Sequence, residues 1–252
     1  MRRTFTLFVA LAMLILGAAP ALANNTWNGY HWAGGATDPH DGSITLALVN
    51  DLSDYKTQYS NVVGDWDGAP GPLTLNSVLG GTRPAACDNV ATDAAGDAIL
   101  GTIHVCNDAY GQNGWLGLAR IWLASDGHID AAVALMNDSY FQVQGSVYDD
   151  AIAQRHVLCQ EIGHTFGLDH QKGPKNHSCM NDQWGLTDTS FQSPNQHDFD
   201  TLKEIYGSSG SGGGDSNTCN PKRPNCPANG QNVQVASRPG GGWIVTFTVP
   251  AG

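Results

Sequence analysis

The chain has 252 residues, of which 23 are Asp or Glu and 12 are Lys or Arg, so its formal net charge is -11. Such an acidic surface repels nucleic acid and anionic membranes, and we expect neither as a partner. The length is enough for one domain with a sizeable core, plus a short appendage.

Residues 1–23 have the pattern of a secretory signal peptide. Arg2 and Arg3 precede an almost unbroken apolar run over residues 4–16, and the segment ends in a small-x-small cleavage site, Ala21-Leu22-Ala23. Its removal takes away two arginines and no acids, which lowers the formal charge from -11 to about -13. No later apolar stretch is long enough to span a bilayer. We therefore expect a soluble protein that is secreted.

Short strands dominate the next part of the chain. Residues 24–42 are polar, with turn signals, and predict an irregular arm. Ser53 is a plausible N-cap for a helix that reaches towards Trp66. Several strands with few helices between them favour a mixed, twisted sheet. The expected strands cover residues 43–50, 73–79, 99–106, 117–123 and 128–136.

Residues 149–166 show helical instead of strand periodicity. Apolar and small residues recur there at spacings of three and four, and Asp149 or Asp150 can cap the N-terminus. Gly167 follows the last periodic residue, where helices commonly end in a left-handed turn. A further helix is expected over residues 195–206, stopped by Gly207.

The end of the chain changes in composition. Residues 208–218 are a Gly/Ser-rich linker, and residues 219–252 form a small segment in which residues 243–249 alternate like a strand. About 34 residues is too few for an independent core without a covalent staple. We expect a stapled hairpin packed on the main domain, or a flexible appendage.

All six cysteines follow residue 23. An even number in an exported protein predicts three disulfides, although sequence alone does not fix their connectivity. Proximity along the chain suggests Cys87 with Cys106, Cys159 with Cys179, and Cys219 with Cys226.

The segment over residues 160–170 reads QEIGHTFGLDH and carries the chemistry. On a helix Gln160 lies about 40° from His164 and one turn earlier, while Glu161 lies about 60° to the other side. Gly167, permissive at positive φ, lets the chain reverse and brings His170 back to the same point. Three ligands around an open fourth position, with a carboxylate beside it, are typical of a catalytic zinc site. Glu161 would then serve as the general base towards water.

This segment resembles the metzincin signature H-E-x-x-H-x-x-G-x-x-H, which is followed by a Met-turn; Met180 in Ser178-Cys179-Met180 is the candidate. The resemblance covers residues 43–207. Residues 117–121 look like the edge strand that binds substrate by β-addition, and residues 198–207 look like the C-terminal helix of matrixins. It implies an α+β zinc-protease domain over residues 24–207, acting as a monomer on protein or peptide substrates. No cysteine-switch sequence occurs, so any latency must work differently.

One ligand departs from the family pattern, because Gln160 stands where the first His is expected. An amide oxygen is a harder and weaker zinc donor than imidazole, so copper or another divalent metal stays open. Metzincins of the algal gametolysin type share the Q-E-x-x-H form, which supports activity. A catalytically silent metzincin that acts as a binding protein is the alternative, and a surface-binding protein that works through its tail is a third.

Other polar residues near the motif have weaker assignments. His156 is about 12 Å along the helix from His164, too far to share its ion. His177 could approach the pocket, but a histidine in a loop of this kind is more often exposed on the surface. Asp169 is either a second-layer acceptor or solvent-facing. Calcium sites are unsupported, because the acidic positions lack an ordered loop signature and suit solvated turns better: Asp88, Asp93, Asp97 and Asp108.

Overall fold

The structure is a computed structural model, which leaves the predicted signal peptide, the Gly/Ser linker, Cys219 and Cys226 outside the described residues. The described residues are 26–27, 29–33, 43–67, 71–81, 83–88, 101–173, 175–182, 185, 187–207, 232–238 and 241–251.

One mixed seven-stranded sheet runs through the molecule in the order β2-β1-β3-β5-β4-β7-β6. β1, β2, β3 and β5 are parallel, whereas β4 is antiparallel to both β5 and β7, and β6 is antiparallel to β7. The expected mixed sheet is therefore confirmed. The strands are β1 (Ile44–Asn50), β2 (Leu73–Leu79), β3 (Thr102–Asp108), β4 (Trp115–Leu123), β5 (Ile129–Asn137), β6 (Val233–Ser237) and β7 (Trp243–Pro250).

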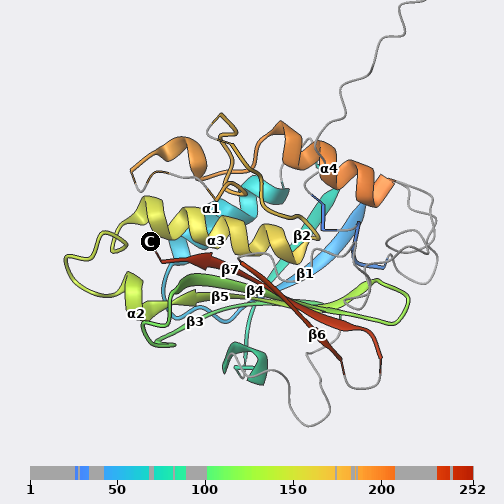
Figure 1. The fold of residues 1–252 in the computed structure, drawn as a ribbon, viewed down its shortest axis with the longest axis horizontal. Coiled ribbons are helices and arrows are strands. Elements are labelled where there is room, and N and C mark those ends of the chain that lie inside the picture. The colour runs from blue at the N-terminus through green and yellow to red at the C-terminus, as the bar shows by residue number, and fades with distance from the viewer. Residues whose placement is uncertain are drawn as a thin grey trace, which may run out of the picture.

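The longer helices lie on one side of this sheet and the 3-10 helix η1 lies on the other (Figure 1). α3 contacts β4, β5 and β7, and α1 contacts α3 and β2. The fold is thus a mixed α+β architecture with few helices. The helices are α1 (Lys56–Asp67), α2 (Asp138–Phe141), α3 (Ala151–Thr165) and α4 (Gln196–Gly207), with 3-10 turns η1 (Ala85–Asp88) and η2 (Thr189–Phe191).

α3 begins where the sequence suggests. The side chain of Asp150 accepts a hydrogen bond from the backbone N–H of Ile152, which satisfies one of the free amides at the helix start. From His156 to Thr165 every residue of this helix is buried. Its hydrophobic pattern is accordingly weak, because sheet, loops and α1 surround it instead of solvent.

β4 differs from the expectation that residues 117–121 form an edge strand. It pairs with β5 on one side and, over its whole length, with β7 on the other. All nine of its residues are buried. The expectation was wrong because β7, which comes from the far end of the chain, takes the edge that β4 would otherwise expose.

Two disulfides are present in the described part of the chain. Cys87 is bonded to Cys106, and Cys159 to Cys179, as the sequence suggests. The bonded cysteines are 19 and 20 residues apart in the sequence. Each disulfide can stabilise the fold by about 3 kcal/mol through restriction of the unfolded chain. The second ties α3 to the segment that contains Met180.

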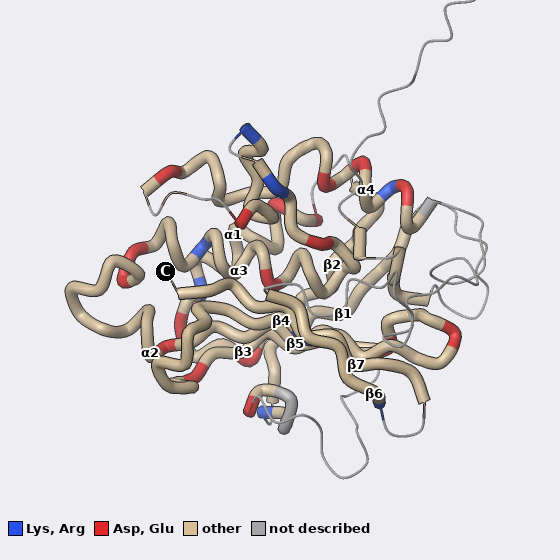
Figure 2. Tube along the Cα trace, viewed as in Figure 1, with Lys and Arg blue, Asp and Glu red and all other residues tan. Residues whose placement is uncertain are grey.

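Both faces of the sheet are covered by apolar side chains. The larger cluster lies between the sheet and the helices, and includes Val157, Ile162 and Phe247. A smaller one on the other face includes Trp115, Trp122 and the Cys87–Cys106 disulfide. Asp and Glu outnumber Lys and Arg and are spread over the described chain (Figure 2). Among the described residues no helix combines the length and the apolar character needed to cross a bilayer.

Candidate functional site

α3 carries three of the expected site residues into the interior. Gln160, Glu161 and His164 have no exposed surface. They lie within about one helical turn of one another, so their side chains leave the helix within a sector of about 100°. Glu161 and His164 face β4 and β7, whereas Gln160 contacts Asp182.

The chain reverses at Gly167, as the sequence predicts. Gly167 has φ of 95°, and a Cβ there would overlap the backbone carbonyl of Tyr30. Only glycine fits this combination of positive φ and close approach. The reversal returns His170 to His164, so that their ring centroids lie 4.4 Å apart at 78°. The structure therefore brings the two histidines together.

His164 has one nitrogen engaged and one available. Its Nδ1 lies 2.8 Å from the carbonyl oxygen of Leu168, which can only accept, so Nδ1 carries the hydrogen. Nε2 is then a lone-pair acceptor, and it has no hydrogen-bond partner in the described part. Burial lowers the pKa of His164 to about 4, which leaves the imidazole neutral at pH 7. Neutral imidazole is the form that binds metals.

Asp182 orients two of the other expected ligands. Nε2 of Gln160 donates to Oδ1 of Asp182 at 3.4 Å, and Nδ1 of His170 lies 3.4 Å from the same oxygen. One carboxylate oxygen thus faces the donor ends of both groups, and their other ends, Oε1 of Gln160 and Nε2 of His170, are buried without a well-formed hydrogen bond among the described residues. Burial lowers the pKa of His170 well below its usual value, so it is neutral too.

Sequence reasoning missed Asp182 and considered Asp169 instead. Asp169 accepts from the backbone N–H of His170. Asp182 gives no sequence signal of its own; it lies two residues after Met180, and its role appears only once the loop is folded against α3.

Glu161 is a fully buried carboxyl group. Burial raises its pKa well above the usual value, and the backbone N–H groups of Val249 and Ala119 partly offset this. Neither carboxyl oxygen meets full hydrogen-bond geometry with a partner in the described residues. It lies directly against β4, since a Cβ at Gly117 would overlap it. Glycine at this position therefore makes room for the carboxyl.

β7 covers the same group of residues from the sheet side. The ring of Phe247 stacks on His164 with centroids 4.4 Å apart and an angle of 6° between planes. Its centroid is 6.3 Å from that of His170. Phe247 is itself fully buried. β7 thus lies against His164 and Glu161 on this side of the site.

The Met180 segment is fixed beneath α3. Met180 is fully buried, and a Cβ on Gly163 would overlap its sulfur. The Cys159–Cys179 disulfide joins this segment to the helix. Oγ of Ser178 donates to Asp198, on α4, at 2.5 Å. Met180 thus lies against the turn of α3 that contains Gly163.

Buried side-chain atoms without a hydrogen-bond partner indicate whether a metal ion suits this site. Nε2 of His164 and Nε2 of His170 are buried without a donor among the described residues, and Oε1 of Gln160 and both carboxyl oxygens of Glu161 are buried there without a well-formed hydrogen bond. Buried polar atoms are nearly always paired, because an unmet one costs roughly 1–3 kcal/mol. A cation satisfies several such acceptors at once. An N₂O donor set with a free carboxylate fits zinc, and it fits other divalent ions as well.

Two other histidines lie close to the motif in sequence. His156 is buried on α3, where its Nδ1 donates to the carbonyl of Phe191 and its ring is hydrogen-bonded to the side chain of Gln160. His177 is exposed, bonds Ser190 and stacks on Phe191, so the surface interpretation holds.

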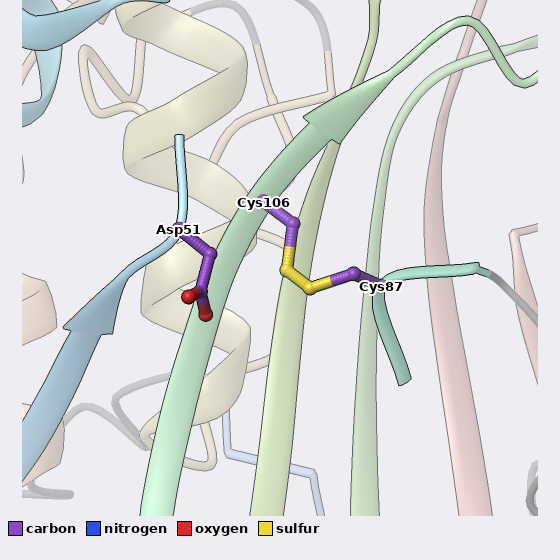
Figure 3. A group of neighbouring side chains, drawn as sticks. All are labelled: Asp51, Cys87 and Cys106. Atoms are coloured by element: carbon purple, nitrogen blue, oxygen red, sulfur yellow. A yellow bond between two sulfur atoms is a disulfide. The ribbon is translucent and has the colours of Figure 1, made fainter. Parts of the chain in front are cut away.

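The acidic positions considered for calcium do not form a site where they are described. Asp88 and Asp108 each pair with Arg83, and Asp93 and Asp97 lie outside the described residues. Asp51, Cys87 and Cys106 approach one another closely (Figure 3). Both sulfurs belong to a disulfide, so they offer no thiolate to a metal.

Comparison with known proteins adds little. No protein-family model matches the chain, and no curated protein matches it. Among solved structures it is similar to high choriolytic enzyme 1, a hatching-enzyme zinc protease from the medaka fish Oryzias latipes. The TM-score is 0.34 and the identity 7%, over 70% of this chain and 94% of that one.

Proposed function

We propose that this chain is a secreted, metal-dependent endopeptidase that hydrolyses peptide bonds in protein or peptide substrates. The proposal is supported by the close approach of the His164 and His170 rings and by the contacts of Asp182 with Gln160 and His170. The resemblance to the metzincin motif gives that cluster its chemical meaning. Export is supported by the signal pattern and by two disulfides, which form and persist outside the cytosol.

Each residue has a defined task in this proposal. Gln160, His164 and His170 hold the metal, zinc by preference, with copper or another divalent ion possible for an amide donor. The bound ion supplies Lewis-acid activation of water and of the scissile carbonyl. Glu161 takes the proton from the attacking water and returns it to the departing amine. Glu161 packs tightly against Gly117, and this contact restricts the positions that its carboxyl group can take.

In this proposal Asp182 orients the metal ligands and does not contact the substrate. By accepting from Gln160 and facing Nδ1 of His170, it turns the amide oxygen and the imidazole Nε2 away from itself. Carboxylates behind metal-bound histidines act in this way, and they raise ligand basicity.

A silent binding protein with the same fold is the second candidate. It is favoured by the departure at Gln160 and by the complete burial of Glu161 and His164 behind β7. The two candidates differ in whether peptide bonds are broken, so hydrolysis decides between them.

The test compares metal content and casein hydrolysis in wild type and Glu161→Ala. We expect stoichiometric zinc in both proteins and a loss of hydrolysis of at least about 100-fold in the variant, as for removal of a general base. Glu204→Ala, at the exposed glutamate of α4, is the matched control and should keep wild-type activity. Equal hydrolysis by wild type and Glu161→Ala would refute the assigned base, and purified protein without metal would refute the site.

A further inference from the structure

β7 lies where an extended peptide would have to lie to reach Glu161. β4 is the strand alongside the carboxyl, and β7 is paired with it in antiparallel register over Trp115 to Leu123. Strand addition to an exposed edge is a general way to bind an extended peptide. The edge of β4 is the only edge of this kind that the described residues place beside the site, and it is filled.

The register sets two β7 side chains over the candidate ligands. Phe247 is opposite Ala119 and stacks on His164, while Val249 is opposite Gly117, where Glu161 lies. Phe247 thus places an apolar ring, not a peptide carbonyl, against the histidine. β7 therefore fills the edge of β4 without placing one of its own peptide bonds against His164.

The remainder of the sheet does not depend on β7 for its order. β2, β1, β3, β5 and β4 form a continuous five-stranded sheet from residues 44–137. β7 has only β6 on its other side, and β6 is a five-residue edge strand with mostly exposed or half-buried residues. The β6–β7 hairpin comes last in the strand order, so its release would leave the pairing of the other five strands unchanged while it exposes Phe247, which is fully buried.

We propose that β7 is an intramolecular ligand of the peptide groove along β4, so that the chain holds its own site closed until this strand is displaced. The inference rests on the proposed peptidase function, because it names the regulation of that site. The displacing partner is an extended peptide with an aromatic side chain that can take the place of Phe247 over His164. Substrate binding and β7 docking then compete for one edge.

A reversible lock tests this competition. Arg120 and Thr246 are directly opposite each other in the antiparallel pairing of β4 and β7, where cross-strand Cβ atoms lie about 4.5–5.5 Å apart, so cysteines at these two positions can reach each other. Thr246 is half-buried, whereas the four cysteines of the native disulfides are fully buried. Mild reductant should therefore open the Arg120→Cys/Thr246→Cys bond first. The wild type, and each single variant, carried through the same oxidation and reduction, are the controls.

Two readouts separate this inference from the peptidase proposal. Binding of a labelled synthetic peptide with the sequence of residues 243–251 is measured in the Glu161→Gln background, and casein hydrolysis is measured with Glu161 intact. We expect oxidation of the lock to lower both by at least about tenfold, a difference of roughly 1.4 kcal/mol, and reduction to restore both.

The outcomes are distinct. Peptide binding that is equal in the oxidised and reduced forms would overturn the inference, and so would measurable casein hydrolysis at the same rate in both forms. If the lock controls peptide binding while neither form hydrolyses casein, the competition between β7 and the peptide stands and the peptidase proposal fails. If both forms hydrolyse casein equally, the peptidase proposal stands and the inference fails.

Discussion

The candidate site has two sides, called here the helix wall and the strand wall. They differ in how far apart their parts are in the sequence. The helix wall is one continuous stretch, residues 151–182, closed on itself by the Cys159–Cys179 disulfide. The strand wall joins β4 to β7, whose contacting residues Arg120 and Thr246 are 126 positions apart. The helix wall holds every group to which the proposed function assigns chemistry, and in the proposed regulation the strand wall covers them. Local sequence thus places the candidate reactive groups, and a distant segment packs against them.

The largest effect is expected from removing the ring of the strand wall. Phe247→Ala should lower the free energy of unfolding by about 3–5 kcal/mol, as for other buried aromatics, and should increase binding of the 243–251 peptide because the cover over His164 is lost. Denaturant unfolding and peptide binding measure the two effects.

Leu48→Ala is the matched control for stability alone. Leu48 is fully buried in β1, away from β7 in the strand order, and its truncation should cost about 2–5 kcal/mol. Peptide binding should not rise. A rise of the same size in both variants would mean that general loosening, not the cover, limits access.

Inside the helix wall, a single methyl group should disturb the packing of α3 on the Met180 segment. A Cβ at Gly163 would overlap Met180 and approach Trp66, so Gly163→Ala should cost about 1–3 kcal/mol through overpacking. Gly64→Ala on α1 meets no atom and should stabilise the protein by up to about 1 kcal/mol. Thermal unfolding of both variants checks the sign. Destabilisation by Gly64→Ala would show that the pair does not isolate the contact with Met180.

The difference between the walls also explains what the sequence could predict. Helix periodicity, the cap at Asp150, the turn at Gly167 and the two described disulfides all depend on residues within about twenty positions, where spacing carries geometric meaning. The pairing of β4 with β7 depends on contacts between strands that are far apart in the sequence. The alternation within residues 243–249 does not specify which strand is the partner. Asp182 was missed for a related reason, since its contacts appear only after the loop from Gly173 to Met180 is placed.

A smaller effect is expected at the carboxylate that orients two ligands. Asp182→Asn should weaken zinc binding by about 10–100-fold, as for other groups behind metal ligands, while α3 stays folded. Competition with a chromophoric chelator measures the affinity. Asp188→Asn, at the exposed cap of η2, is the control and should leave zinc affinity unchanged. If both variants bind zinc equally well, Asp182 does not position the ligands.

The smallest effect concerns the ligand that departs from the family pattern. Gln160→His replaces an amide oxygen by imidazole, a better donor for zinc, so zinc affinity should stay equal or rise by up to about tenfold. Gln154→His, on the same helix but paired with Gln58, should change nothing and controls for an added surface histidine. A collapse of affinity in Gln160→His would mean that the amide meets a demand imidazole cannot. Asp182 is the contact that would be lost, because it accepts from Nε2 of Gln160 while Oε1 faces away, and an imidazole of different shape has to keep the same donor contact.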